Sequence, residues 1–179
     1  IIVAILDSGI DKDNFLFDGR IVDLGLNLST SGDGIQDDNG HGTAVASIVA
    51  KNSDAYLMPI KIANSDGKGT VLSLYLAIQT AIENEADIIN VSLTTTSSDL
   101  LTSVIKEATE KGIKVVAAAG NQSANVKNYA PANIDNVITV AATDEEYRPA
   151  PYSNYGNLVN YSALGTLFSE EDSFKGTSI

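Results

Sequence analysis

The 179-residue sequence predicts an α/β fold of three layers, in which a mostly parallel central sheet carries helices on both faces. Two observations predict this class. Short apolar runs alternate along the chain with stretches of helical periodicity, as they do in βαβ units. Several of the runs are apolar at nearly every position, which is typical of strands buried on both faces. A chain of this length fits one domain, so residues 1–179 are expected to form a single unit.

The apolar runs predict six strands. The first, at 1–6, is apolar at every position, and the fifth is interrupted only by Lys114, as expected of a central buried strand. The other runs are shorter or more mixed but are bounded by polar residues and glycines. The strands are expected near residues 1–6, 20–24, 55–62, 87–93, 113–119 and 136–142.

Three helices are expected, near residues 42–51, 71–85 and 99–111. The third carries the clearest signals. Ser97 or Ser98 can cap its start, Glu107 and Lys111 form a favourable pair four residues apart, and Gly112 can end it in the left-handed conformation. Its apolar stripe consists of Leu100, Leu101, Val104, Ile105 and Ala108.

Charge and composition argue against several classes of protein. The formal net charge is −12 and the eleven Lys and Arg residues are scattered, whereas nucleic-acid binding requires basic patches. The chain has no cysteine, which excludes disulfides, thiolate metal sites and cysteine nucleophiles. No window reaches 18 consecutive apolar residues, so no membrane-spanning segment is expected. The negative charge either serves solubility or steers cationic peptides toward the protein.

The single histidine, His41, is the one side chain whose ordinary pKa suits proton transfer near neutral pH. Two polar residues directly follow apolar strands: Asp7 after the run 1–6 and Asn121 after the run 113–119. Functional groups in such sheets gather at the carboxyl ends of the strands. We therefore expect both residues to lie at the same edge as His41, which begins a helix. Ser178, near the end of the chain, adds a potential nucleophile.

The order Asp7, His41, Ser178, with Asn121 before the serine, resembles the catalytic core of the subtilisin-like serine proteases, the subtilases of peptidase family S8. The resemblance covers essentially the whole chain. It implies a serine endopeptidase that hydrolyses peptide bonds through an acyl-enzyme, with no cofactor. In that mechanism His41 is the general base, Asp7 orients it, and Ser178 is the nucleophile. The Asn121 side chain and the Ser178 backbone N–H stabilise the oxyanion.

The same resemblance implies that a peptide or protein substrate lies extended between two edge segments, adding a strand to each. A propeptide is a further candidate partner, and a secreted or cell-surface location is favoured, with the cytoplasm left open. Val71, Leu74, Leu93 and Leu101 either line an apolar substrate pocket or belong to the core. The residues expected to bind substrate are Gly67, Lys68, Gly69, Thr70, Ser92, Leu93, Thr94, Ala119 and Gly120.

The sequence also departs from the family pattern. Thr94 and the two threonines after it stand where relatives commonly have glycines, which narrows the cleft beside the substrate backbone. The connection 52–54 leaves no room for the calcium-binding loop of many relatives, so we expect no metal site of that kind.

Only Ile179 follows Ser178, so the domain is expected to lack the part that follows the nucleophile and, as given, to be catalytically poor. Two alternatives stay open: a peptide-binding protein that does not cleave, and a peptide ligase or macrocyclase that uses the same acyl-enzyme.

Overall fold

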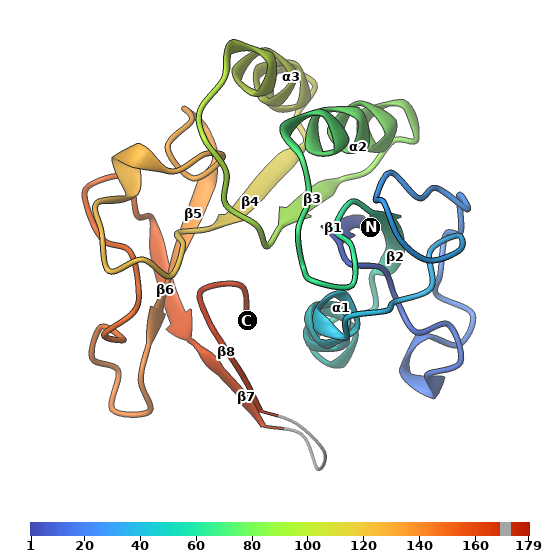
Figure 1. Ribbon diagram of the computed structural model, residues 1–179, viewed down its shortest axis with the longest axis horizontal. Coiled ribbons are helices and arrows are strands. Elements are labelled where there is room, and N and C mark those ends of the chain that lie inside the picture. The colour runs from blue at the N-terminus through green and yellow to red at the C-terminus, as the bar shows by residue number, and fades with distance from the viewer. Residues whose placement is uncertain (169–172) are drawn as a thin grey trace.

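The computed structural model describes residues 1–168 and 173–179 and confirms the three-layer α/β architecture (Figure 1). A parallel sheet of six strands runs in the order β2-β1-β3-β4-β5-β6. Helix α1 covers one face of this sheet, and α2 and α3 cover the other. The strands are β1 (Ile2–Asp7), β2 (Tyr56–Lys61), β3 (Ile88–Val91), β4 (Lys114–Ala118), β5 (Ile138–Thr143) and β6 (Tyr161–Leu164).

The helices are α1 (His41–Asn52), α2 (Val71–Glu83) and α3 (Asp99–Glu110), with two short 3-10 turns, η1 (Phe15–Phe17) and η2 (Val126–Asn128). The expected cap, ion pair and stop of α3 are confirmed, but in the predicted apolar stripe Leu100 is exposed, because the buried face of the helix begins at Leu101. The Ser98 hydroxyl accepts from Leu101 N at 3.2 Å, and Lys111 pairs with Glu107 at 2.9 Å. Gly112 follows the helix with φ +86°, the conformation that glycine adopts without strain.

The alternation of side chains along β1 divides the core into two parts. Ala4 and Leu6 pack with residues of α2 and α3, whereas Val3 and Ile5 pack with residues of α1. All four are buried, as expected for a strand covered on both faces. The two cores hold β1 rigidly, so the position of the residue at its carboxyl end is well defined.

The expected strand at 20–24 is wrong. Ile21 forms only an isolated bridge with Leu57, at the outer edge of β2. The chain turns away directly afterwards, because Gly25 has φ +63° and its N–H donates to the Asp23 carboxylate at 2.7 Å. The polar turn interrupts the pairing, which resumes only as a second isolated bridge between Asn27 and Lys61, so no continuous strand forms.

The structure adds three strands that the apolar runs did not indicate. They are β6 and a two-stranded antiparallel hairpin, β7 (Thr166–Phe168) with β8 (Ser173–Lys175). All four residues of β6 are exposed, so the segment has no continuous apolar run. The hairpin leads the chain back to the centre of the molecule, where residues 176–179 lie (Figure 1). In the described residues, no helix is long and apolar enough to cross a membrane.

Candidate active site

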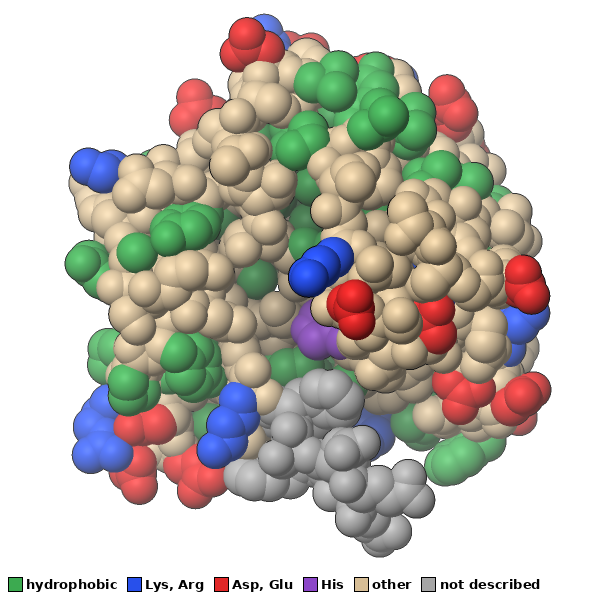
Figure 2. Space-filling view, in the orientation of Figure 1, with side chains coloured by type: hydrophobic (Ala, Val, Ile, Leu, Met, Phe, Trp, Pro, Cys, Tyr) green, Lys and Arg blue, Asp and Glu red, His purple; other side chains and the backbone are tan. Residues whose placement is uncertain are grey.

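The carboxyl end of β1 meets the beginning of α1. Asp7, the last residue of β1, is 1% exposed, and its Oδ1 lies 2.7 Å from Nδ1 of His41, the first residue of α1. The approach is close because α1 has a glycine at the contact: a Cβ on Gly42 would overlap the carbonyl oxygen of Gly9, which follows β1. In Figure 2 the imidazole lies at the edge of the hollowed centre of this face.

Two carboxylates act on the imidazole. Burial by itself would lower the pKa of His41, but the hydrogen bond and charge of Asp7, together with the charge of Asp37, raise it above the ordinary value. Burial would likewise raise the pKa of Asp37, but hydrogen bonds from the Thr43 hydroxyl and from backbone N–H groups at 39, 40 and 43 lower it. Asp37 is therefore ionised in the neutral range.

The oxyanion candidate Asn121 lies just beyond β4, and Thr177 fixes its orientation. Asn121 Oδ1 accepts from Thr177 N at 2.9 Å and from Thr177 Oγ1 at 3.1 Å. Thr177 Oγ1 in turn accepts from Gly120 N at 2.9 Å. The amide nitrogen of Asn121 donates to no acceptor within residues 1–168 and 173–179, so its N–H groups are available to a ligand.

Ser178 lies close to this group but has a different partner. Its Oγ donates to the Ser92 carbonyl at 3.0 Å, and Ser92 Oγ donates back to the Ser178 carbonyl at 3.3 Å. Among the hydrogen bonds of the described residues, none joins Ser178 to His41. Ile179 packs against the apolar cluster that includes Val45 of α1, which places this end of the chain on the same side of the sheet as His41.

The segments expected to bind substrate border the site. Residues 67–70 form the turn between β2 and α2, and Thr70 caps α2. Ser92, Leu93 and Thr94 follow β3, and Thr95 anchors that segment through two backbone hydrogen bonds with Ala130, at 2.8 and 2.9 Å.

Within the described part of the chain, the N–H groups of Gly69 and Thr94 donate to no acceptor. Ala119 and Gly120 lie buried just beyond β4.

The apolar pocket candidates divide into two groups. Leu74 and Leu101 are 3% and 0% exposed and belong to the core between the sheet and α2 and α3, so the core alternative holds for both. Val71 and Leu93 are half-buried at the margin of that core. Only these two have surface that a substrate could contact.

Two supporting residues escaped the sequence interpretation. Asn154 is 1% exposed: its amide donates to the Ala119 carbonyl at 2.8 Å, and its Oδ1 accepts from Gln122 N and Ala124 N, both at 3.0 Å. It therefore fixes the loop that carries Asn121, although nothing in its sequence context marks it. Asp37, four residues before His41, carried no signal of its role either, yet its carboxylate caps the start of α1.

The short connection between α1 and β2, residues 53–55, is closed by an arginine. The Arg20 guanidinium donates to the carbonyls of Ala50 at 2.9 Å, Ser53 at 2.7 Å and Ala55 at 2.8 and 3.1 Å. A fixed positive charge thus lies at the carboxyl end of α1, where the helix dipole favours a cation. The absence of a calcium site stays a prediction.

Known proteins resemble this chain in sequence and in fold. The model of the Subtilase family matches residues 1–178. The minor extracellular protease Epr of Bacillus subtilis is 34% identical over 175 residues, which cover 92% of this chain and 26% of that protein. The thermostable alkaline protease of Halalkalibacterium halodurans is 37% identical over 174 residues, which cover 91% of this chain and 47% of that protein. The chain thus spans about a quarter to about half of these relatives.

A similar solved structure, the crystal structure of a cold adapted subtilisin-like serine proteinase, superimposes with a TM-score of 0.88 at 27% identity. That match covers 99% of this chain and 69% of the solved one. Sequence and fold therefore lead to one conclusion: the chain belongs to the subtilase family.

Proposed function

We propose that the whole protein is a serine endopeptidase that cleaves peptide bonds through an acyl-enzyme. The observation that carries the proposal is the contact of 2.7 Å between the buried Asp7 carboxylate and the His41 imidazole, because it leaves Nε2 as the ring nitrogen that can accept a proton. The amide of Asn121, oriented by Thr177, supplies a hydrogen-bond donor at the same edge of the sheet.

In the proposed reaction the Ser178 hydroxyl gives up its hydrogen bond to the Ser92 carbonyl and donates to Nε2 of His41 instead. As Ser178 Oγ attacks the peptide carbonyl carbon, its proton passes to His41, and Asp7 stabilises the resulting imidazolium. The negative charge that develops on the carbonyl oxygen is met by the Asn121 amide and the Ser178 backbone N–H. His41 then protonates the leaving amine. A water molecule, deprotonated by His41, attacks the ester carbonyl carbon, and His41 returns the proton to Ser178 Oγ as the acid product leaves.

The proposed substrate is an extended peptide held between residues 67–70 and 92–94. The half-buried Thr94 carries a β-branched side chain at this edge, and its Cγ2 would lie 3.1 Å from a Cβ on Gly120. The space between Thr94 and Gly120 is therefore narrow, which favours small substrate side chains beside this pair. The net charge of −12 favours the approach of cationic peptides at low ionic strength.

One observation favours a second candidate, a protein that binds peptides without cleaving them: the hydroxyl of Ser178 is bonded to the Ser92 carbonyl. Reaction of the whole protein with a fluorophosphonate probe separates the candidates, because only an activated serine is labelled. We expect one label on Ser178 and none in Ser178→Ala.

Peptide binding without labelling would support the second candidate and refute the first. The masses of the products with a peptide substrate then separate hydrolysis from ligation to an amine.

A further inference from the structure

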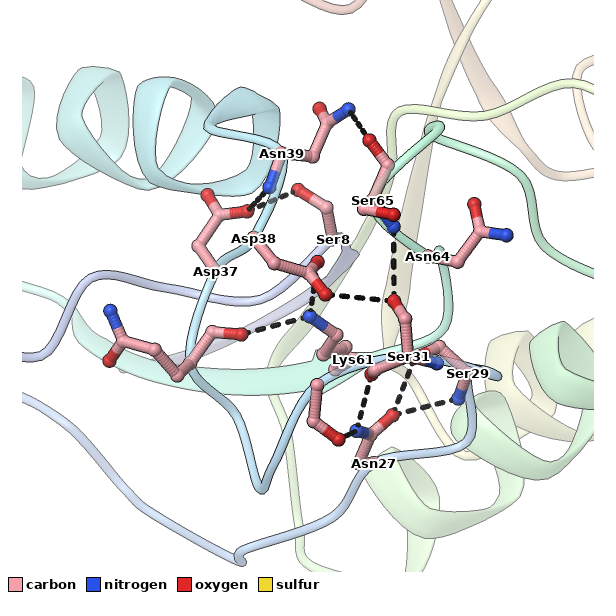
Figure 3. Close-up of polar contacts among 12 residues, drawn as sticks. Ser8, Asn27, Ser29, Ser31, Asp37, Asp38, Asn39, Lys61, Asn64 and Ser65 are labelled. Atoms are coloured by element: carbon pink, nitrogen blue, oxygen red, sulfur yellow. Dashed lines mark hydrogen bonds and ion pairs between the residues drawn. The ribbon is translucent and has the colours of Figure 1, made fainter.

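The carboxylate of Asp37 collects five hydrogen bonds from the described residues. Its Oδ1 accepts from Ser8 Oγ at 2.8 Å, Asn39 N at 3.0 Å and Gly40 N at 2.9 Å. Its Oδ2 accepts from the N–H and the hydroxyl of Thr43, at 2.9 and 2.6 Å. Figure 3 shows the bonds from Ser8 and Asn39. One anion thus joins the end of β1 to the beginning of α1.

This carboxylate takes over the capping of α1. The N-cap residue is Gly40, which has no side chain to accept from the first turn. The first N–H groups of a helix have no partner within the helix. Asp37 accepts from Thr43 N, and Ser8 Oγ accepts from Gly42 N at 2.9 Å. The turn of helix that carries His41 is therefore fixed from outside.

Ser8 connects the two carboxylates. Its hydroxyl donates to Asp37, and its N–H donates to Asp7 Oδ1 at 2.7 Å. The same Asp7 oxygen lies 2.7 Å from His41 Nδ1. The hydrogen bond between Ser8 and Asp37 is thus a second connection, besides the Asp7–His41 contact, between the end of β1 and the start of α1.

The charged groups around His41 are few. Asp7 acts from β1, and Asp37 acts from the loop before α1. The neighbouring Asp38 is paired with the buried Lys61. The charged residues of the turn after β2, at 66 and 68, are exposed to solvent.

We propose that Asp37 is a positioning residue for the general base. Through Ser8 and the first turn of α1 it fixes the geometry of the Asp7–His41 pair, and its negative charge stabilises the imidazolium that forms when Ser178 attacks. The catalytic part of this inference rests on the proposed endopeptidase function, whereas the effect on His41 itself does not.

The first test is an NMR titration of the His41 imidazole in the whole protein, with the signal assigned from His41→Gln. Asp37→Asn removes the charge but keeps the shape of the side chain, and we expect His41 to titrate at lower pH than in the wild type. Asp33→Asn is the matched control: it makes the same change in net charge in the same loop, at an exposed side chain with no hydrogen bond among the described residues. If Asp37 only capped α1, Asp37→Asn would not change the pH at which His41 titrates. Titration of His41 at the same pH in both variants would therefore overturn the proposal.

The second test separates the effect of the Ser8–Asp37 hydrogen bond from the effect of the Asp37 charge, and it requires the loss of a single hydroxyl group. Ser8→Ala keeps Asp37 but removes the bridge to it, and we expect kcat to fall on the order of tenfold or more with little change in KM, because misplacement of a catalytic group costs rate rather than binding. Ser47→Ala is the control, since its hydroxyl donates to the Thr43 carbonyl of the same helix at 2.8 Å without touching Asp37.

Wild-type kcat in Ser8→Ala would overturn the positioning role. A wild-type protein with no hydrolytic activity would instead refute the proposed function and leave the titration result standing.

Discussion

Replacing Asn121 with alanine probes the oxyanion site directly. Among the described residues the side-chain nitrogen of Asn121 donates to no acceptor, so in the proposed mechanism its N–H groups meet the oxyanion without breaking a hydrogen bond within the protein. Loss of one such donor raises the activation free energy by about 3–4 kcal/mol, which corresponds to a fall in kcat of roughly 10²–10³. We expect KM to change little, because the oxyanion exists only in the transition state and not in the bound substrate.

The same substitution also removes the acceptor of two hydrogen bonds from Thr177, at 2.9 and 3.1 Å. Each is expected to contribute about 1 kcal/mol to stability. Thr177→Val removes the hydroxyl that donates to Asn121 and accepts from Gly120 N, but it keeps the amide of Asn121, so it serves as the control for the structural part of the effect.

The assay is the steady-state hydrolysis of a chromogenic peptide by the whole protein, with thermal melts of both variants alongside. A rise in KM at unchanged kcat would show that Asn121 binds substrate in the ground state. Equal losses of kcat in both variants would show that the effect is structural. Either result would refute the oxyanion assignment.

Three further predictions concern stability. Arg20→Met removes the donor to the three carbonyls at the end of α1, so we expect a loss of roughly 2–3 kcal/mol and a fall in Tm of about 5–10 °C, whereas Arg148→Met, at a side chain 69% exposed, should change Tm little. Excess EDTA should leave Tm and activity nearly unchanged, and a fall of many degrees would reveal a metal site. Because the folded pKa of His41 is raised, its charged form stabilises the fold below the ordinary value of 6.5, and this contribution is lost as the pH rises through the folded pKa. The difference in Tm between wild type and His41→Gln should therefore be larger at pH 5.5 than at pH 9.

The elements that the sequence predicted well have strong local signals. The run 1–6 is apolar at every position, and β1 forms there because both faces are covered. Helix α3 begins at a serine cap and ends before a glycine, and both signals act within a few residues. The Asp7–His41 contact follows from the same logic, because a parallel sheet brings the carboxyl end of β1 to the start of α1.

Other features depend on contacts that no local pattern shows. Ile21 forms a single bridge with β2 before the turn at Gly25. The run 20–24, which resembled a strand in the sequence, therefore does not form one. A leucine such as Leu74 or Leu101 can line a pocket or fill a core, and the sequence does not distinguish the two. The packing of α2 and α3 on the sheet buries both leucines in the core.

The interactions of polar side chains were equally hidden. Asp37 lies four residues before His41 in the sequence, but its five hydrogen bonds depend on how β1 and α1 meet. The partner of Ser178, the Ser92 carbonyl, lies 86 residues away in the sequence. Such interactions are set by tertiary structure, so residue identity alone does not predict them.

If the Asp7–His41 pair activates Ser178, the rate at which a fluorophosphonate acylates the whole protein depends on His41. In His41→Ala, with the far-UV circular dichroism of the wild type, we predict a loss of roughly 10⁴-fold or more, as expected when a member of a catalytic triad is removed. Acylation of Ser178 at more than about 1% of the wild-type rate would contradict the account.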